Sequence, residues 1–166
     1  MFYQKINPIY KRNKQGHIIE GDYVYPEFKN MKDALWDAAE KIDGMNMRII
    51  FSPEIKCMRI AGKTDRADIP DQLKKYILDH FPVDALSEYF SKGGTKEVII
   101  FGEGYGQGIR TGGVYRNDQA VILFDVNIDG WWMNRSFVEA VAKRFEVDSV
   151  PYLGQMTLTE AVERVR

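Results

Sequence analysis

The stretch EKIDGMNMRIIFS, residues 40–52, places a lysine directly before a turn and a strand. The Ile-Asp-Gly step predicts the turn, because aspartate and glycine favour turn conformations. The β-branched and apolar run Met45–Ser52 predicts a strand. Asn46 and Arg48 share one face of that strand, because side chains two residues apart point to the same side of a sheet. The stretch therefore predicts Lys41 at an element boundary, beside a strand with a polar face.

Lys41 is the candidate nucleophile of this stretch. A lysine amine attacks a phosphorus or carbonyl centre only when it is deprotonated, and desolvation or neighbouring cations lower its pKa. Arg48 and Lys63 are the candidate neighbouring cations. The pattern K-x-D-G by itself equally fits a surface lysine beside a β-turn, so both interpretations stay open at this point.

Strands are also expected on both sides of this stretch. Residues 1–30 predict short strands and loops, whereas Met31–Glu40 has good helix propensity. The apolar patterns predict three further strands, at Lys56–Ala61, Val98–Phe101 and Ala120–Val126.

Helices are expected where apolar residues recur at helical spacing. Pro70–Tyr89 predicts one helix, which makes a β-β-helix unit with the two strands before it. Asn134 predicts the cap of a second helix, and Thr157 with Glu160 predicts a capping box for a last one. The irregular alternation of strands and helices predicts an α+β domain rather than a doubly wound parallel sheet.

Two further elements are candidates for a ligand site. Glu103 stands where the strand of residues 98–101 runs into a glycine-rich loop, whose glycines allow close backbone approach to a ligand. The loop matches neither a P-loop nor a dinucleotide fingerprint, and a plain connection between strands remains an alternative. In the strand of residues 120–126, alternation places Leu123 and Asp125 on one face and Phe124 on the other, where Phe124 could equally be a core residue.

Size and composition limit the classes of protein. The 166 residues, 45% of them hydrophobic, predict one domain over residues 1–166. The net charge of −1 creates no global positive field, so any contact with nucleic acid must be local. The basic run Tyr10–Lys14 fits either a phosphate contact or a solvated loop. The single Cys57 excludes an intramolecular disulfide, and no signal peptide or membrane span is visible, so we expect an intracellular, cytoplasmic protein without membrane contact.

Five ordered segments together resemble the RNA ligases of the covalent nucleotidyltransferase superfamily, in particular the compact bacteriophage-type and bacterial ones. They are EKIDGMN (40–46), AGKTDRADIP (61–70), IIFGEGYGQGI (99–109), ILFDV (122–126) and VPYLG (150–154). Asn46 is the residue seen in RNA ligases where DNA ligases and capping enzymes commonly carry arginine. The resemblance implies an α+β nucleotidyltransferase fold, that is, a ligase adenylation domain with ATP-grasp-like antiparallel sheets flanked by helices around a nucleotide cleft. It also implies a strand at Leu35–Glu40, against the local helix propensity.

The resemblance further implies an ATP-dependent reaction with RNA. Lys41 would attack the α-phosphate of ATP to form lysyl-AMP, AMP would pass to an RNA 5′-phosphate, and a 3′-hydroxyl would seal the strand. Glu103 matches the carboxylate that contacts the ribose, Phe124 matches the aromatic residue on the adenine face, and Glu40 lies where the chain meets the adenine edge. A divalent cation, Mg²⁺ or Mn²⁺, is expected because the triphosphate charge must be neutralised, and its ligands are not assigned. The full expected ATP-binding set is Glu40, Lys41, Asn46, Arg48, Lys63, Glu103 and Phe124.

The sequence departs from the family at two places. Lys63 stands where the family usually has an arginine, which keeps the charge but loses the planar fork that grips phosphate. The later E-G-x-V-type and K-x-K-type motifs have no match, and the apolar face of the last helix is still in phase at Arg166. We therefore expect an adenylation domain that is incomplete at its C-terminus. The alternatives are a truncated, weak or inactive module that binds nucleotide or RNA, and another polynucleotide ligase or capping-type nucleotidyltransferase.

Overall fold

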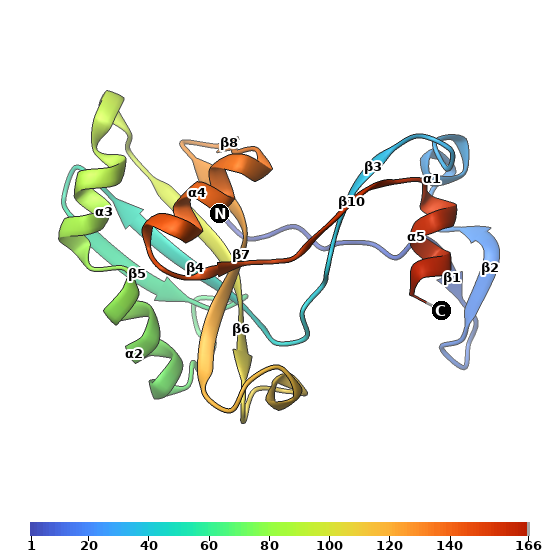
Figure 1. The fold of residues 1–166 in the computed structure, drawn as a ribbon, viewed down its shortest axis with the longest axis horizontal. Coiled ribbons are helices and arrows are strands. Elements are labelled where there is room, and N and C mark those ends of the chain that lie inside the picture. Colours follow the sequence, from blue (N-terminus) through green and yellow to red (C-terminus); the bar gives the residue numbers. More distant parts are fainter. Residues whose placement is uncertain (166) are drawn as a thin grey trace. The chain divides into compact units, whose positions relative to one another are not determined.

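The computed structural model describes residues 1–165, which divide into two compact units (Figure 1). Unit 1 comprises Met1–Tyr3 and Lys41–Val150, and unit 2 comprises Gln4–Glu40 and the described residues from Pro151 onward. The single adenylation domain expected over residues 1–166 stays a prediction, because the division into units does not test it. No helix within residues 1–165 has the length and apolar character needed to cross a membrane.

A six-stranded sheet forms the centre of unit 1. Its main path runs in the order β5 (Cys57–Ala61), β4 (Met45–Ser52), β6 (Val98–Gly106), β7 (Gln119–Ile128) and β8 (Trp131–Trp132). These neighbours pair antiparallel, and β9 (Asp148–Ser149) pairs parallel with β7. The expected α+β architecture with antiparallel pairing is confirmed.

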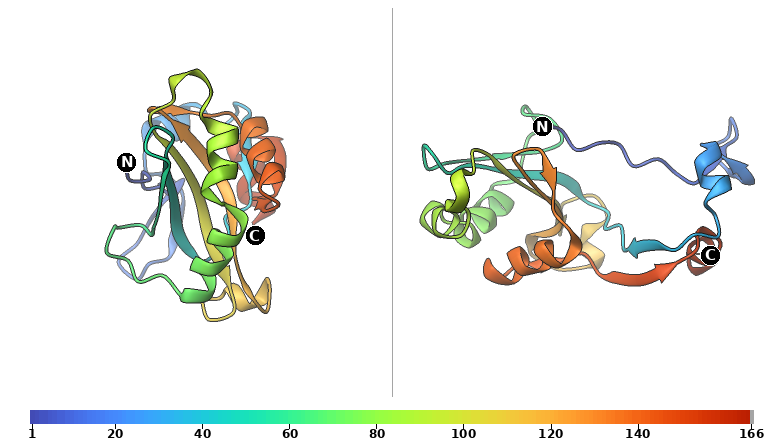
Figure 2. Two further views of the ribbon diagram at one scale, coloured as in Figure 1. Left: turned by 90° about the vertical axis from the view of Figure 1, so that its left-hand side faces the viewer. Right: turned by 90° about the horizontal axis from the view of Figure 1, so that it is seen from above.

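Three helices cover one face of this sheet: α2 (Asp71–His80), α3 (Val83–Phe90) and α4 (Arg135–Arg144) (Figure 2). The largest core cluster joins their apolar residues to alternate residues of the strands, for example Met47, Ile49 and Phe51 of β4. Two short 3₁₀ turns, η1 (Lys92–Gly94) and η2 (Gly112–Val114), lie in the connections. The opposite face of the sheet carries no helix of unit 1 (Figure 2). On that face Tyr3, from the N-terminal residues Met1–Tyr3, packs against a second core cluster.

The single helix expected over Pro70–Tyr89 is wrong, because the segment forms two helices. Pro82 disfavours helical geometry at Phe81, and α2 accordingly ends at His80 while Phe81 has φ −115° and ψ 58°. Pro82 then caps α3. The other two helical predictions hold at their starts: Asn134 accepts a hydrogen bond from the Phe137 N–H (3.0 Å), and the capping box of Thr157 and Glu160 is present.

The strand β6 is longer than the expected Val98–Phe101, and it runs on to Gly106. Gly102 and Gly104 therefore lie inside a strand, as does Glu103, instead of in a loop. A Cβ on Gly102 would come within 2.6 Å of a Val121 methyl group, and one on Gly104 within 2.5 Å of Leu73. These glycines are required by close packing on both sides of β6.

Unit 2 is built from short elements. They are β1 (Tyr10–Arg12), β2 (Ile18–Tyr23), α1 (Pro26–Asn30), β3 (Trp36–Ala39), β10 (Tyr152–Met156) and α5 (Leu158–Arg164). The last helix ends at Arg164, with Val165 as its C-cap. The expectation that its apolar face stays in phase up to Arg166 falls on a residue outside the described part of the chain.

The strand β3 decides between two expectations for residues 35–40. Local propensity favoured a helix and was wrong, whereas the strand implied by the family resemblance is confirmed. β3 pairs antiparallel with β10, and Trp36 lies opposite Met156. The Leu158 N–H also donates to the Lys32 carbonyl (3.0 Å). Pairing with a distant segment thus overrides a weak local preference.

Candidate active site

The segment Lys41–Gly44, called the Lys41 turn below, is irregular with a bend at Gly44 instead of the expected regular turn, and it is clamped onto β6. The Gly44 N–H donates to the Glu103 carboxylate (3.1 Å), and a Cβ on Gly44 would lie only 2.2 Å from the Gly104 carbonyl oxygen. Only glycine allows the turn to approach the strand this closely. Lys41 itself is exposed, and the next residue, Ile42, is buried. The clamp therefore holds an exposed lysine beside a half-buried glutamate.

The charges around Lys41 act on two carboxyl groups. Burial raises the pKa of Glu103, and the charges of Lys41 and Arg110 and the backbone hydrogen bond oppose this rise. The hydrogen bond from the Thr111 hydroxyl (2.5 Å) lowers the pKa of Asp43, and the charges of Arg110 and Lys41 act in the same direction. Two carboxylates and two cations thus gather around this turn.

Sequence reasoning missed Arg110 and Thr111 as neighbours of Lys41. Both lie in the loop after β6, and Arg110 has a positive φ of 47°, which is uncommon for a residue with a side chain. The density of glycines in residues 102–113 was the available signal, because such a loop can fold back on the strands beside it. Which charged residue it would bring to Lys41 could not be read from the pattern.

Asn46 lies directly opposite Glu103 in the register between β4 and β6. Its side-chain oxygen is buried and has no hydrogen-bond partner. Because a buried oxygen without a partner costs free energy, a donor or a cation that reached this atom would be bound favourably. Asn46 and Glu103 therefore lie side by side, next to the segment that carries Lys41, and their expected roles in binding ATP stay predictions.

Phe124 is the extra residue of a β-bulge. Phe101 pairs with Asp125 and Gly102 with Leu123, so the register skips Phe124. The simple alternation expected here is wrong: Leu123 packs into the core on the helix side, whereas Asp125 and Phe124 both contact Tyr3 on the other face. A bulge re-aims a side chain in this way.

The aromatic ring of Phe124 stays only partly buried. It packs against the cluster that contains Ile42, the residue after Lys41, and also against the cluster that contains Phe101. The Phe124 ring therefore lies between the Lys41 turn and the face of the sheet that carries no helix.

Arg48 has an internal role in the structure. It is 1% exposed, and its guanidinium donates to the carbonyls of Gly62 (2.8 Å) and Met1 (3.0 Å) and to Asp65 (2.7 Å). Asp65 also pairs with Arg59 (3.1 Å), and the hydrogen bonds from both arginines lower the pKa of its carboxyl group. An ATP phosphate would reach Arg48 only by replacing one of these partners, so its expected ATP contact stays a prediction.

The two remaining candidates lie in different surroundings. Lys63 is exposed, in the segment after β5. Glu40 belongs to unit 2, where its N–H donates to the Pro151 carbonyl (3.0 Å). Neither placement tests the expected role.

A metal ion would find few ligands in the protein alone. Within residues 1–165, no three His, Cys, Asp or Glu side chains gather closely enough to hold one. The side chains with oxygen atoms nearest in the chain or the sheet register to the Lys41 segment are Asp43, Asn46 and Glu103. Mg²⁺ that is bound with nucleotides usually takes most of its ligands from phosphate and water.

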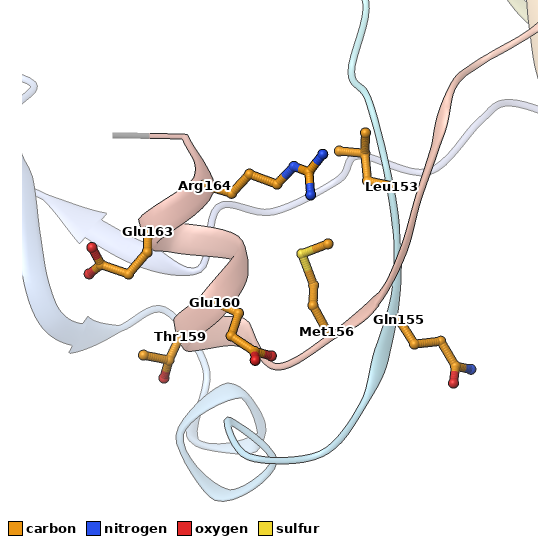
Figure 3. Close-up of a pocket in the computed structure, with 7 residues that line it drawn as sticks. All are labelled: Leu153, Gln155, Met156, Thr159, Glu160, Glu163 and Arg164. Carbon is orange, nitrogen blue, oxygen red and sulfur yellow. The ribbon is translucent and has the colours of Figure 1, made fainter.

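A pocket of about 570 Å³ is present in unit 2, between β10 and α5 (Figure 3). Its lining residues are Leu153, Gln155, Met156, Thr159, Glu160, Glu163 and Arg164. None of the predicted nucleotide-binding residues lies there. The candidate active site is therefore the region around Lys41 and not this pocket.

Comparisons with known proteins agree with the geometry. No curated protein sequence matches the chain. Among solved structures, a lysine-to-alanine variant of the Naegleria gruberi RNA ligase with ATP and Mn has a TM-score of 0.65 at 16% identity, covering 84% of this chain and 42% of that one. The Naegleria gruberi RNA ligase with PPi has the same values. A lysine-to-methionine variant with AMP and Mn has a TM-score of 0.63 at 16% identity, covering 80% and 40%.

The structural likeness shows the nucleotidyltransferase fold, and the chain spans about two fifths of the length of the RNA ligases it matches. The RNA ligase family itself matches residues 35–166, which include the Lys41 turn, Glu103 and Phe124. This match covers most of the chain, and the chain therefore belongs to the RNA ligase family.

Proposed function

We propose that this chain is the nucleotide-binding part of an ATP-dependent RNA ligase, with Lys41 as the residue that becomes adenylylated. One observation carries the proposal: the Gly44–Glu103 clamp holds the Lys41 turn beside the face of the sheet that presents Glu103, Asn46 and Phe124. The family match over residues 35–166 and the solved relatives with ATP, AMP and Mn support it.

In the first step, the Lys41 amine forms a bond to the α-phosphorus of ATP, and the bond from that phosphorus to the β-phosphate oxygen breaks. Pyrophosphate leaves, and the amine proton passes to solvent or a neighbouring base. Phe124 would stack on adenine and Glu103 would accept hydrogen bonds from the ribose hydroxyls, so that the α-phosphate lies in line with the amine. Arg110 supplies positive charge close to the same turn.

In the later steps, AMP moves from Lys41 to the 5′-phosphate of an RNA end, and a 3′-hydroxyl then displaces AMP and seals the strand. Asp43, Asn46 and Glu103 would face a Mg²⁺ or Mn²⁺ ion carried mainly by phosphate and water. Such an ion would neutralise the triphosphate charge. Glu40, Arg48 and Lys63 complete the proposed ATP-binding set.

Labelled ATP tests the first step. The chain is incubated with Mg²⁺ and ATP labelled at the α- or the γ-phosphate, and the protein is denatured and counted. We expect label from the α-position only, none with Lys41→Ala, and normal labelling with Lys92→Ala, an exposed lysine of η1. Label that survives Lys41→Ala would refute the assignment. A comparison of ATP with GTP as donor separates a ligase from a capping-type enzyme.

A nucleotide-binding module without chemistry is the second candidate. ATP binding in calorimetry without label on the protein would support this candidate against the first.

A further inference from the structure

The first two residues of the chain are fixed by a buried arginine. The Met1 carbonyl accepts a hydrogen bond from Arg48 (3.0 Å), and the Arg48 guanidinium lies 4.7 Å from the centre of the Phe2 ring. Arg48 is itself held by the Gly62 carbonyl and Asp65. The N-terminus is thereby attached to the sheet face that has no helix.

Tyr3 also attaches the N-terminus to the sheet, at the strands β6 and β7 that carry Glu103 and Phe124. Its hydroxyl donates to Asp125 (2.5 Å), and its ring lies 4.9 Å from that of Phe124, 5.1 Å from Phe101 and 5.8 Å from Trp132. Burial raises the pKa of Tyr3, and burial also raises the pKa of Asp125. Tyr3 is thus a neutral donor packed among three aromatic rings.

The ring of Phe124 depends on this packing because of the bulge. The backbone ladder does not fix the orientation of a bulged residue, and neighbouring side chains must do so. On one side Phe124 meets the cluster of Ile42, and on the other it meets the edge of Tyr3, with an angle of 69° between the two rings. Edge-to-face pairs of this kind are directional and favourable beyond the area that they bury.

We propose that Tyr3 is a positioning residue that holds Phe124 in the orientation needed to stack on the adenine base of ATP. This inference rests on the proposed function, and it gives the N-terminal tripeptide a role in the affinity for the base. Tyr3 touches no reacting atom, so its loss should raise the KM for ATP and leave kcat for lysyl-AMP formation nearly unchanged.

Two substitutions and a matched control test the role of Tyr3. Tyr3→Leu keeps apolar volume but loses the ring, Tyr3→Phe keeps the ring but loses the hydrogen bond to Asp125, and Tyr25→Ala removes a partly exposed tyrosine of unit 2. We would measure the Kd for ATP and for inorganic tripolyphosphate by calorimetry, the KM and kcat of label formation, and the unfolding temperature of each variant.

For Tyr3→Leu we expect ATP to bind about three- to tenfold more weakly, as the loss of one directional aromatic pair predicts. Tripolyphosphate affinity and kcat should change by less than about twofold, because neither uses the base. Tyr3→Phe should restore most of the ATP affinity, and Tyr25→Ala should resemble the wild type. If Tyr3→Leu does not fold, Tyr3→Met, which also keeps apolar volume and lacks the ring, replaces it, with the same weakening expected.

Several outcomes would overturn the inference. Unchanged ATP affinity in folded Tyr3→Leu, or a fall in unfolding temperature alone, would reduce Tyr3 to a structural residue. Equal weakening of ATP and tripolyphosphate would show that Tyr3 does not act through the base. In both cases wild-type labelling leaves the proposed function standing. Absence of ATP binding by the wild type would instead refute the proposed function, and this inference with it.

Discussion

The structure predicts that Gly44→Ala disturbs the position of Lys41. Its Cβ would lie 2.2 Å from the Gly104 carbonyl oxygen, about 1.2 Å short of the 3.4 Å at which ordinary contacts begin. That oxygen belongs to the backbone of a central strand and has little freedom to move. The turn must therefore retreat by about 1 Å, which would stretch the Gly44–Glu103 hydrogen bond and displace Lys41.

The substitution should lower both the rate of labelling and the stability of the fold. A displacement of about 1 Å at a reacting group costs on the order of 10²-fold in rate. Forcing an extra methyl group into a packed site costs about 1–3 kcal/mol of unfolding free energy. We would measure the initial rate of protein labelling from α-labelled ATP, and the free energy of unfolding in urea. Both values should fall for Gly44→Ala.

Gly113→Ala is the matched control for this experiment. Its Cβ would lie 3.7 Å from the Gln107 backbone, an ordinary contact, and Gly113 does not have a positive φ. We expect labelling and stability close to those of the wild type. Labelling of Gly44→Ala at the wild-type rate, in a folded protein, would refute the reasoning that the clamp positions Lys41.

Three further substitutions test other parts of the account. Arg48→Met removes three hydrogen bonds from a side chain that is 1% exposed, and should lower the free energy of unfolding in urea by about 2–4 kcal/mol; a loss below that of a surface mutation would contradict the internal role of Arg48. Asn134→Ala should cost about 1 kcal/mol through loss of the α4 cap, with unchanged labelling by ATP. Burial raises the pKa of Glu103 above 4.5, so its contribution to stability is full below that pH and is lost as the pH rises through the folded value. Glu103→Gln should accordingly raise the unfolding temperature near about pH 8 and leave it unchanged near about pH 4; equal effects at both pH values would count against a buried carboxylate.

The local features of the fold were predictable from the sequence. The strand Met45–Ser52 has the predicted bounds, and the caps at Asn134 and Thr157 form as expected. Each depends on residues close together in the chain. The family resemblance placed Asn46, Glu103 and Lys41 in one expected binding set. The register between β4 and β6 sets Asn46 opposite Glu103, and the expected roles of these residues stay predictions.

The break between α2 and α3 at Pro82 was missed although its cause is local, whereas two other unpredicted features depend on contacts between distant residues. The bulge at Phe124 arises from the register between β6 and β7, and nothing in the sequence ILFDV marks it. Arg48 donates hydrogen bonds to Met1, Gly62 and Asp65, which belong to separate segments of the chain. Periodicity gives the face on which a side chain lies, whereas the partner on that face depends on the fold.

The most direct test of the central claim is to locate AMP on the protein. After incubation with ATP and Mg²⁺, the chain is quenched under conditions that preserve a phosphoramidate, digested, and mapped by mass spectrometry. We predict an added mass of one AMP on the peptide that contains Lys41, with the fragment ions assigning it to that side chain. AMP on another residue, or an unmodified Lys41 in a protein that has released pyrophosphate from ATP, would contradict the assignment of Lys41 as the nucleophile.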